Sequence, residues 1–232
     1  MINNDFIYGL YGGLVGTIIS HPFDTVKTRI QSNTSNTIYE AIKRGKLYSG
    51  ITPPLIGIML EKSIVFGFYE KSKNYGMNDF ISGLIGGFTS TLIVTPVDRL
   101  KINFQNNFKD GIKINTLYKG FMPTIFRETP GFGIYFSVYN YLNNFNQNKN
   151  IYKTFLFGGL SGFSAWIFIY PSDLIKTKYQ SGNNKNLFDI IKITYNSFGL
   201  KGFYKGFNLA ILRAIPLHGG VFVGYELSKK YF

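Results

Sequence analysis

One ten-residue pattern occurs three times in this 232-residue chain, and no other feature limits the fold as strongly. It reads Pro-x-Asp-x-x-Lys-x-x-x-Gln, and its prolines stand 74 and 75 residues apart. Self-similarity at a fixed period is the signature of a repeat architecture, so we expect three related units, residues 1–74, 75–150 and 151–232, in a single domain. The copies consist of Pro22, Asp24, Lys27 and Gln31, then Pro96, Asp98, Lys101 and Gln105, then Pro171, Asp173, Lys176 and Gln180.

Each unit contains two long apolar segments, so the chain has six. They cover about residues 5–31, 50–73, 79–105, 120–143, 152–180 and 206–230. A helix that spans a bilayer needs about 20 residues, and every segment is long enough. Charged residues make up only 16% of the chain, whereas soluble domains average about a quarter. The alternative is a soluble all-α protein, but each glycine would cost such helices about 1 kcal/mol relative to alanine.

Glycine pairs recur in the same register as the prolines. In each unit two glycines stand four residues apart, and the first lies 13 residues before the proline. This spacing places both glycines on one face of a helix, where they allow close approach of a neighbouring helix in lipid. The pairs are Gly9 with Gly13, Gly83 with Gly87, and Gly158 with Gly162.

The second segment of each unit carries its own repeated motif. It opens with Tyr-x-Gly, and a further tyrosine follows 19 residues after the glycine. The glycines are Gly50, Gly120 and Gly206, and the later tyrosines are Tyr69, Tyr139 and Tyr225. The polar pairs that come next are Glu70 with Lys73, Asn140 with Asn143, and Glu226 with Lys229. Each unit is therefore predicted to be two helices joined by a polar loop of variable length.

These motifs together resemble the mitochondrial carrier family over essentially the whole chain. The resemblance implies an all-α membrane protein, a bundle of six transmembrane helices with threefold pseudosymmetry around a central substrate cavity. It also implies a transporter that works as a monomer and exchanges metabolites by alternating access across the mitochondrial inner membrane. The richness in Asn, Ile, Lys, Tyr and Phe suggests an AT-rich genome, and a viral gene would act on the mitochondria of its host.

The resemblance assigns the first motif to a gate on the matrix side. It implies the ion pairs Asp24–Lys101, Asp98–Lys176 and Asp173–Lys27, braced by Gln31, Gln105 and Gln180. Proline kinks a helix, so Pro22, Pro96 and Pro171 would bring the charged ends together. One such pair at 4 Å contributes about 4 kcal/mol at an effective dielectric constant of 20, which gives a firm but breakable gate. The alternative is that each pair is a static contact near the membrane boundary.

The opposite gate is uneven, because the second unit has Asn140 and Asn143 where the others carry charges. Pairing around the ring would leave Lys73–Glu226 as the one full ionic contact of an outer gate formed by Glu70, Lys73, Glu226 and Lys229. We therefore expect a weak outer gate and a protein that favours the conformation open to the outside. The Tyr-x-Gly glycines resemble sites at which helix N-termini hold the phosphates of cardiolipin.

The substrate contacts implied by the family lie seven and eight residues after each Tyr-x-Gly glycine. Here they are Gly57 and Ile58, Arg127 and Glu128, and Arg213. Two arginines in one cavity favour an anion with several oxygens, since arginine binds phosphate or carboxylate bidentately. Gly57-Ile58 resembles the adenine contact of nucleotide carriers, so a nucleotide (ATP, ADP or a deoxynucleotide) is the first expectation.

The Arg127-Glu128 pair indicates a different substrate. It resembles amino-acid and carnitine-type carriers, in which such a pair would hold a zwitterion, so this is the alternative expectation. Glu61 and Lys62, one turn along, either enter the cavity or pair with each other. A channel-like or structural membrane protein is a third reading.

The composition argues against several other classes. The chain has no cysteine, and His21 and His218 are too few for a histidine-rich metal site, so we expect no metal, no cofactor and no enzyme activity. Only MINND precedes the first apolar segment, so membrane insertion is expected to use internal spans. The net charge is +13, but the basic residues flank apolar segments, which favours lipid headgroups over nucleic acid.

Overall fold

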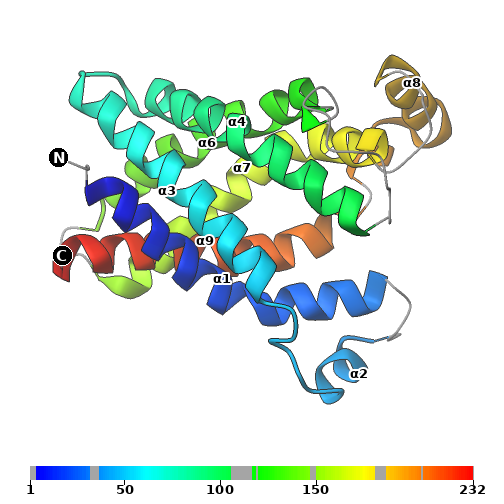
Figure 1. The fold of residues 1–232 in the computed structure, drawn as a ribbon, viewed down its shortest axis with the longest axis horizontal. Coiled ribbons are helices and arrows are strands. Elements are labelled where there is room, and N and C mark those ends of the chain that lie inside the picture. The colour runs from blue at the N-terminus through cyan, green and yellow to red at the C-terminus, as the bar shows by residue number, and fades with distance from the viewer. Residues whose placement is uncertain are drawn as a thin grey trace.

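The structure, a computed structural model, describes residues 4–31, 37–105, 117–118, 120–146, 150–180, 187–204 and 206–231. Within this part of the chain the fold is all-α, as predicted. Six long helices, two in each predicted unit, form its frame (Figure 1). They are α1 (Asn4–Gln31), α3 (Thr52–Asn74), α4 (Asp79–Gln105), α6 (Phe121–Asn143), α7 (Ile151–Gln180) and α9 (Phe207–Tyr231).

The six helices form a closed ring. Each packs on the next one in chain order, and α9 returns to pack on α1. The two chain termini lie at the same end of the bundle (Figure 1). We call this the aromatic end, because Tyr69, Tyr139 and Tyr225 lie toward it, and the opposite one the kink end, after the prolines of α1, α4 and α7. Three short elements, α2 (Ile38–Lys43), α8 (Leu187–Phe198) and η1 (Gly199–Tyr204), lie at the kink end.

The repeated glycines lie where two helix backbones touch, as the sequence predicts. A Cβ atom added to Gly9 would stand 2.5 Å from the carbonyl oxygen of Lys62, which joins α1 to α3. In the second unit, a Cβ at Gly83 would stand 2.5 Å from the carbonyl oxygen of Phe132. In the third, Gly158 is similarly close to the backbone of His218, at 2.8 Å. Each glycine pair therefore fixes the contact between the two helices of its own unit.

Two tyrosines of the Tyr-x-Gly motif replace helical hydrogen bonds that the prolines remove. Proline at position i has no N–H, so the carbonyl of residue i−4 loses its helical hydrogen bond. That carbonyl belongs to Leu92 in α4, and the Tyr118 hydroxyl donates to it at 3.2 Å. In α7 it belongs to Ile167, and the Tyr204 hydroxyl donates to it at 3.0 Å. The corresponding Tyr48 stacks on the His21 ring instead.

Phenylalanine in place of Tyr118 or Tyr204 is therefore expected to destabilise the protein by about 1 kcal/mol each, the usual net worth of one hydrogen bond. Tyr48→Phe is the matched control, and we expect it to leave stability unchanged. Thermal unfolding of the purified protein in detergent measures all three variants. If all three variants lose the same stability, the hydrogen bonds to the carbonyls of Leu92 and Ile167 are not what Tyr118 and Tyr204 contribute.

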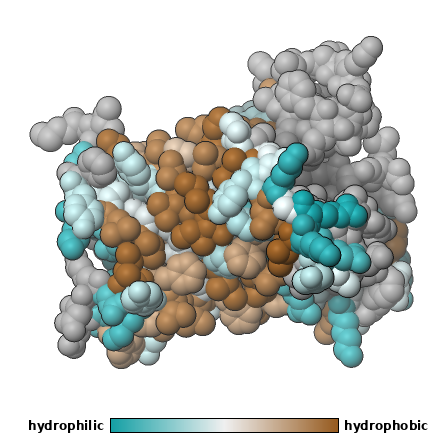
Figure 2. All heavy atoms as spheres, turned by 90° about the horizontal axis from the view of Figure 1, so that it is seen from below, coloured by the Kyte–Doolittle hydropathy of each residue, from teal (hydrophilic) through white to brown (hydrophobic). Residues whose placement is uncertain are grey.

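The outer surface carries many apolar side chains. Figure 2 shows them gathered over the middle of the bundle, with hydrophilic residues toward both ends. Around the bundle as a whole, the exposed apolar side chains include Ile18, Phe88, Leu92, Phe126, Leu156 and Phe168. An apolar surface of this extent fits insertion into a membrane. Among the described residues, two helices, in residues Asp79–Val97 and Ile151–Lys176, are long and apolar enough to cross a membrane. Six membrane-crossing helices remain a prediction beyond this finding.

Candidate functional site

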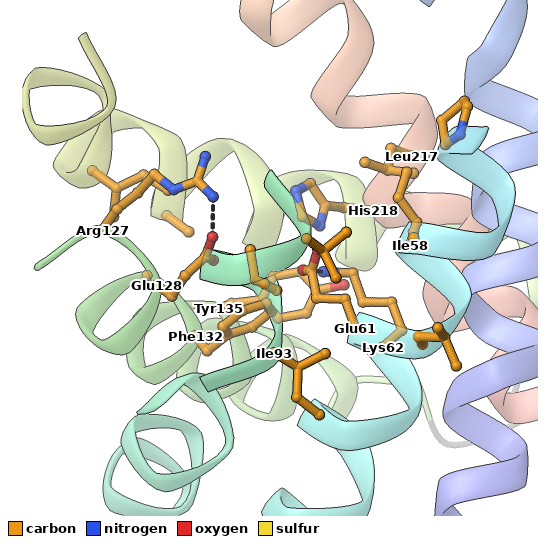
Figure 3. Close-up of a pocket in the computed structure, with 18 of the residues that line it drawn as sticks. Ile58, Glu61, Lys62, Ile93, Arg127, Glu128, Phe132, Tyr135, Leu217 and His218 are labelled. Atoms are coloured by element: carbon orange, nitrogen blue, oxygen red, sulfur yellow. Dashed lines mark hydrogen bonds and ion pairs between the residues drawn. The ribbon is translucent and has the colours of Figure 1, made fainter. Parts of the chain in front are cut away.

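A cavity of about 560 Å³ lies inside the helix ring, on the kink side of the aromatic residues. Helices α3, α4, α6, α7 and α9 contribute to its wall (Figure 3). All five residues predicted to contact a substrate line it: Gly57, Ile58, Arg127, Glu128 and Arg213. Their spacing from the Tyr-x-Gly glycines thus places them around one space, while their role in binding stays a prediction.

Arg127 lies between two carboxylates. Its guanidinium donates to Asp173 Oδ1 at 2.9 Å and also contacts the carboxylate of its neighbour Glu128. Figure 3 shows the second contact at one side of the cavity. Asp173 was predicted to belong to the matrix gate, so this ion pair connects a predicted gate residue directly to a predicted substrate contact.

The other two basic residues of the cavity wall also have acidic partners. Arg213 Nε lies 2.5 Å from Asp24 Oδ1, so a second gate aspartate pairs with a predicted substrate contact. Lys62 Nζ lies 2.7 Å from Glu61 Oε1, and the ammonium stands 4.5 Å from the centre of the Phe132 ring. Glu61 and Lys62 therefore both line the cavity and pair with each other.

The basic residues of the described cavity wall all have carboxylate partners. Each of the three basic residues there, Lys62, Arg127 and Arg213, faces at least one carboxylate. Polar groups in a low-dielectric site act strongly on a ligand, so an unbalanced wall would select for charge of one sign. A wall on which every cation is paired with a carboxylate suits a ligand that carries both signs.

Two further residues of the wall were not predicted from the sequence. Trp166 on α7 donates its indole N–H to His218 Nε2 on α9 at 3.3 Å, and both line the cavity. The His218 ring also packs against Tyr135, with 4.8 Å between ring centres. His218 lies five residues after Arg213, just as Lys62 lies five after Gly57, so the repeat register was the signal that could have found it.

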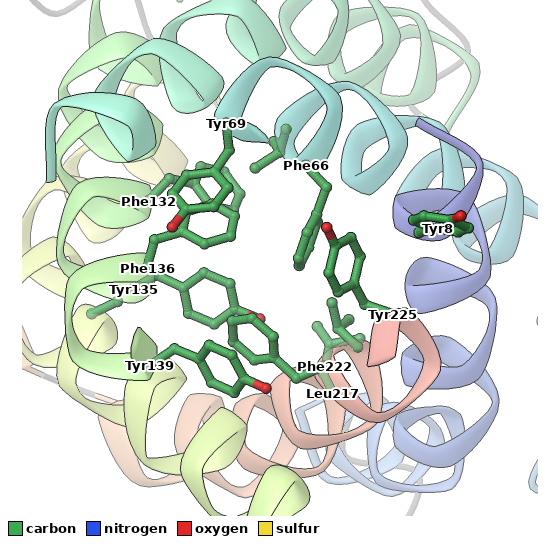
Figure 4. Packing of buried hydrophobic residues seen from close by; sticks show 13 residues of the cluster. Tyr8, Phe66, Tyr69, Phe132, Tyr135, Phe136, Tyr139, Leu217, Phe222 and Tyr225 are labelled. Atoms are coloured by element: carbon green, nitrogen blue, oxygen red, sulfur yellow. The ribbon is translucent and has the colours of Figure 1, made fainter. Parts of the chain in front are cut away.

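An aromatic cluster closes the cavity at the aromatic end. Phe66, Phe136 and Phe222 come from α3, α6 and α9 and contact one another, with ring centres 5.1, 5.7 and 6.2 Å apart (Figure 4). All three are almost fully buried. They stand 16 residues after their Tyr-x-Gly glycines, a threefold repeat that the sequence contained. This end is closed in the structure, whereas the uneven outer gate led us to expect a protein that favours the conformation open to the outside.

The repeated tyrosines complete this closure. Each stacks on a phenylalanine of another helix: Tyr225 on Phe66, Tyr69 on Phe136 and Tyr139 on Phe222. Aromatic pairs contribute about 0.5–1.5 kcal/mol beyond the area they bury, so the ring of stacks adds to the cohesion of this end.

The charged residues near these tyrosines pair differently from the prediction. Lys73 Nζ lies 2.7 Å from Asp79 Oδ1 at the start of α4, and Glu226 is not its partner. The Tyr69 hydroxyl donates to the same carboxylate at 2.9 Å, and Asn140 donates to Tyr69. The reason is proximity: Asp79 follows Lys73 by six residues, across the short connection between α3 and α4. Asp79 thus takes the place that the prediction gave to Glu226.

For several other predicted residues the structure gives the position, while their role stays a prediction. The Tyr-x-Gly glycines precede α3, α6 and α9 with left-handed φ angles of +76° at Gly50, +96° at Gly120 and +87° at Gly206, which explains why only glycine recurs there. Cardiolipin at these sites stays a prediction. Glu70 accepts a hydrogen bond from the Tyr225 hydroxyl at 2.9 Å, and Lys229 lies over the ring of Tyr225. Lys176 is buried.

Part of the predicted matrix gate lies outside the description. The backbone there is helical, but the side chains of Lys27, Gln31, Asp98, Lys101, Gln105 and Gln180 are not among those described. The predicted pairs Asp24–Lys101, Asp98–Lys176 and Asp173–Lys27 consequently stay predictions. In α1, α4 and α7 the prolines Pro22, Pro96 and Pro171 do lie inside the helices, as expected.

Comparison with known proteins agrees with this architecture. The family model described as mitochondrial carrier protein matches residues 2–79, 109–150 and 147–232, which cover all three units. The chain belongs to the mitochondrial carrier family. The resemblance seen in its motifs is confirmed, and membership makes it a transporter of that family.

Individual relatives of this carrier match over nearly their whole length. A mitochondrial glycine transporter of Saccharomyces cerevisiae is 30% identical, over 97% of this chain and 90% of the relative. The mitochondrial carnitine carrier of the same yeast is 29% identical, over 98% and 87%. A mitochondrial basic amino acids transporter of Rattus norvegicus is 28% identical, over 98% and 89%.

Proposed function

We propose that this carrier moves a small zwitterion, an amino acid or a carnitine-like molecule, across the mitochondrial inner membrane. The observation that supports this most directly is the pairing at Arg127, which contacts both Glu128 and Asp173. The carboxylate of a zwitterion can replace one of these acids at the guanidinium, and its ammonium group can take the place of the arginine beside Glu128. Both charges of the ligand are then satisfied without an excess charge in the cavity.

A nucleotide, the first expectation from the sequence, fits this wall less well. Its phosphates need several cations, whereas the described basic residues of the wall each face a carboxylate. The relatives also favour the alternative, since their names refer to glycine, carnitine and basic amino acids. Gly57 and Ile58 border the cavity but serve an apolar part of a zwitterion equally well.

Alternating access is the proposed mechanism, and the closed aromatic end supports it. The Phe66–Phe136–Phe222 contacts join three helices without a covalent link, so they can separate when the helices tilt apart. The kink end would close in turn by the charged residues that follow the prolines. In the present structure Asp24 and Asp173 pair with Arg213 and Arg127, so these two aspartates connect the proposed gate to the proposed binding site.

Uptake into proteoliposomes tests the proposed function. Vesicles are loaded with glycine, lysine, carnitine or ATP, and uptake of the same labelled compound is measured for the wild type and for Arg213→Ala. We expect exchange of at least one zwitterion, no exchange of ATP, and loss of exchange in the variant. Exchange of ATP alone would reinstate the nucleotide reading, and a leak of all four compounds without exchange would indicate a channel.

A further inference from the structure

One wall of the cavity is aliphatic and has no part in the charge network. Ile56 and Leu60 on α3 and Ile93 and Val97 on α4 line the cavity, and we call them the aliphatic strip. Their exposed fractions are 54%, 48%, 43% and 44%, so all four are also accessible from outside. The strip thus extends from the cavity to the outer surface along the seam between α3 and α4.

The two helices separate along this strip. Nearer the aromatic end they touch, because a Cβ atom at Gly86 would stand 2.7 Å from the carbonyl oxygen of Val65. Ile93 and Val97 lie seven and eleven residues after Gly86, so the period of 3.6 residues places them on the same face of α4. That face is covered by α3 at Gly86 and exposed at Ile93 and Val97. The seam therefore opens toward the kink end.

The equivalent seam between α6 and α7 does not repeat this opening. Phe126 on α6 holds the register of Ile56, and Phe168 on α7 holds that of Ile93. Both are 67% exposed, but the wall of the cavity in the described residues includes neither. A difference in sequence accompanies this. Leu60 in α3 stands where α6 and α9 have Pro130 and Pro216, and a helix without proline lacks the corresponding bend.

We propose that the carried molecule has an aliphatic chain besides its zwitterionic head, and that this chain lies along the aliphatic strip. The inference rests on the proposed function and names a narrower class of substrate for the same cavity. The head would bind at Arg127 and Glu128. One continuous cavity of about 560 Å³ joins these residues to the strip, and the strip offers the chain only aliphatic contacts.

Chain length is the variable that tests this proposal. Glycine, 2-aminobutyrate, 2-aminohexanoate and 2-aminooctanoate share one head and differ only in methylene groups. Burial of one methylene is worth about a fourfold gain in affinity, so we expect binding to tighten by about that factor at each added carbon. The protein contains a single tryptophan, Trp166, and it lines the cavity, so its fluorescence reports binding without a label.

Paired variants assign the effect to the strip. Ile56→Ser with Ile93→Ser should remove the dependence on chain length and leave glycine binding within about twofold. Phe126→Ser with Phe168→Ser is the matched control, since these residues hold equivalent positions outside the cavity, and it should keep the dependence. Loss of the dependence in both double variants would show that the strip is not its source, which overturns the proposal.

A second measurement does not depend on polar substitutions. The chain has no cysteine, so Ile93→Cys adds one unique thiol, and 2-aminooctanoate should slow its reaction with a maleimide at least tenfold, whereas glycine should not. If all four amino acids bind equally and none protects the thiol, this inference is wrong and the proposed function stands. If the protein neither binds nor transports any of these four amino acids, lysine or carnitine, the proposed function itself fails.

Discussion

Replacing Glu128 by glutamine is expected to lower uptake of a zwitterionic substrate by about 10- to 100-fold. A hydrogen bond to a charged group contributes about 1.5–3 kcal/mol, and Glu128 is the buried carboxylate proposed to receive the ammonium group of the substrate. Glutamine keeps the shape of the side chain and removes only its charge. Initial rates of exchange in proteoliposomes measure the effect, and Glu40→Gln on the exposed α2 helix is the control.

The same variant should change the preference for ligand charge. Without the Glu128 charge, Arg127 keeps one carboxylate partner in Asp173, and the cavity gains one net positive charge. We expect a dicarboxylate such as succinate to compete more strongly in Glu128→Gln than in the wild type, while glycine and carnitine compete less. If all ligands weaken by the same factor and the melting temperature falls, Glu128 supports the helix packing and does not select the charge of the substrate.

The sequence predicts those parts of the molecule that the threefold repeat specifies. Gly9, Gly83 and Gly158 recur at one register position, and each lies at a backbone contact, because close helix packing depends only on the absence of a side chain there. The contact positions Arg127 and Arg213 likewise fall around one cavity, since equal spacing on equivalent helices leads to equivalent places. Repetition thus predicts location well.

Repetition predicts partners less well. Lys73 pairs with Asp79, which belongs to no repeated motif, because the short connection between α3 and α4 brings the two side chains together. The pairs of Arg127 with Asp173 and of Arg213 with Asp24 connect different units. Such pairs depend on the tilt of the helices, and under the proposed alternating-access mechanism one sequence serves every tilt of the cycle. The pairing in one state cannot be deduced from residue spacing for that reason.

The largest expected effect on stability comes from the glycine contacts of α4. A Cβ atom at Gly83 would stand 2.5 Å from the carbonyl oxygen of Phe132, and one at Gly87 would stand 2.7 Å from that of Glu128. Both obstacles are backbone atoms, so the two helices must move apart to admit an alanine. Overpacking of this kind costs about 1–3 kcal/mol per site. For a chain of this size, the double variant Gly83→Ala with Gly87→Ala should lower the melting temperature by about 5–15 °C.

Gly57→Ala is the matched control for this prediction. Gly57 also lies within a helix, but no atom lies within 4 Å of its added Cβ, so alanine should keep or raise stability through its better helix propensity. Because Gly87 packs on the backbone of Glu128, the double variant should also lower substrate affinity, which Trp166 fluorescence can measure on the protein that remains folded. Equal melting temperatures for the double variant and for Gly57→Ala would mean that the contact between α4 and α6 tolerates a wider spacing. Gly83 and Gly87 would then be needed for the movement of the helices past each other and not for their packing in this state.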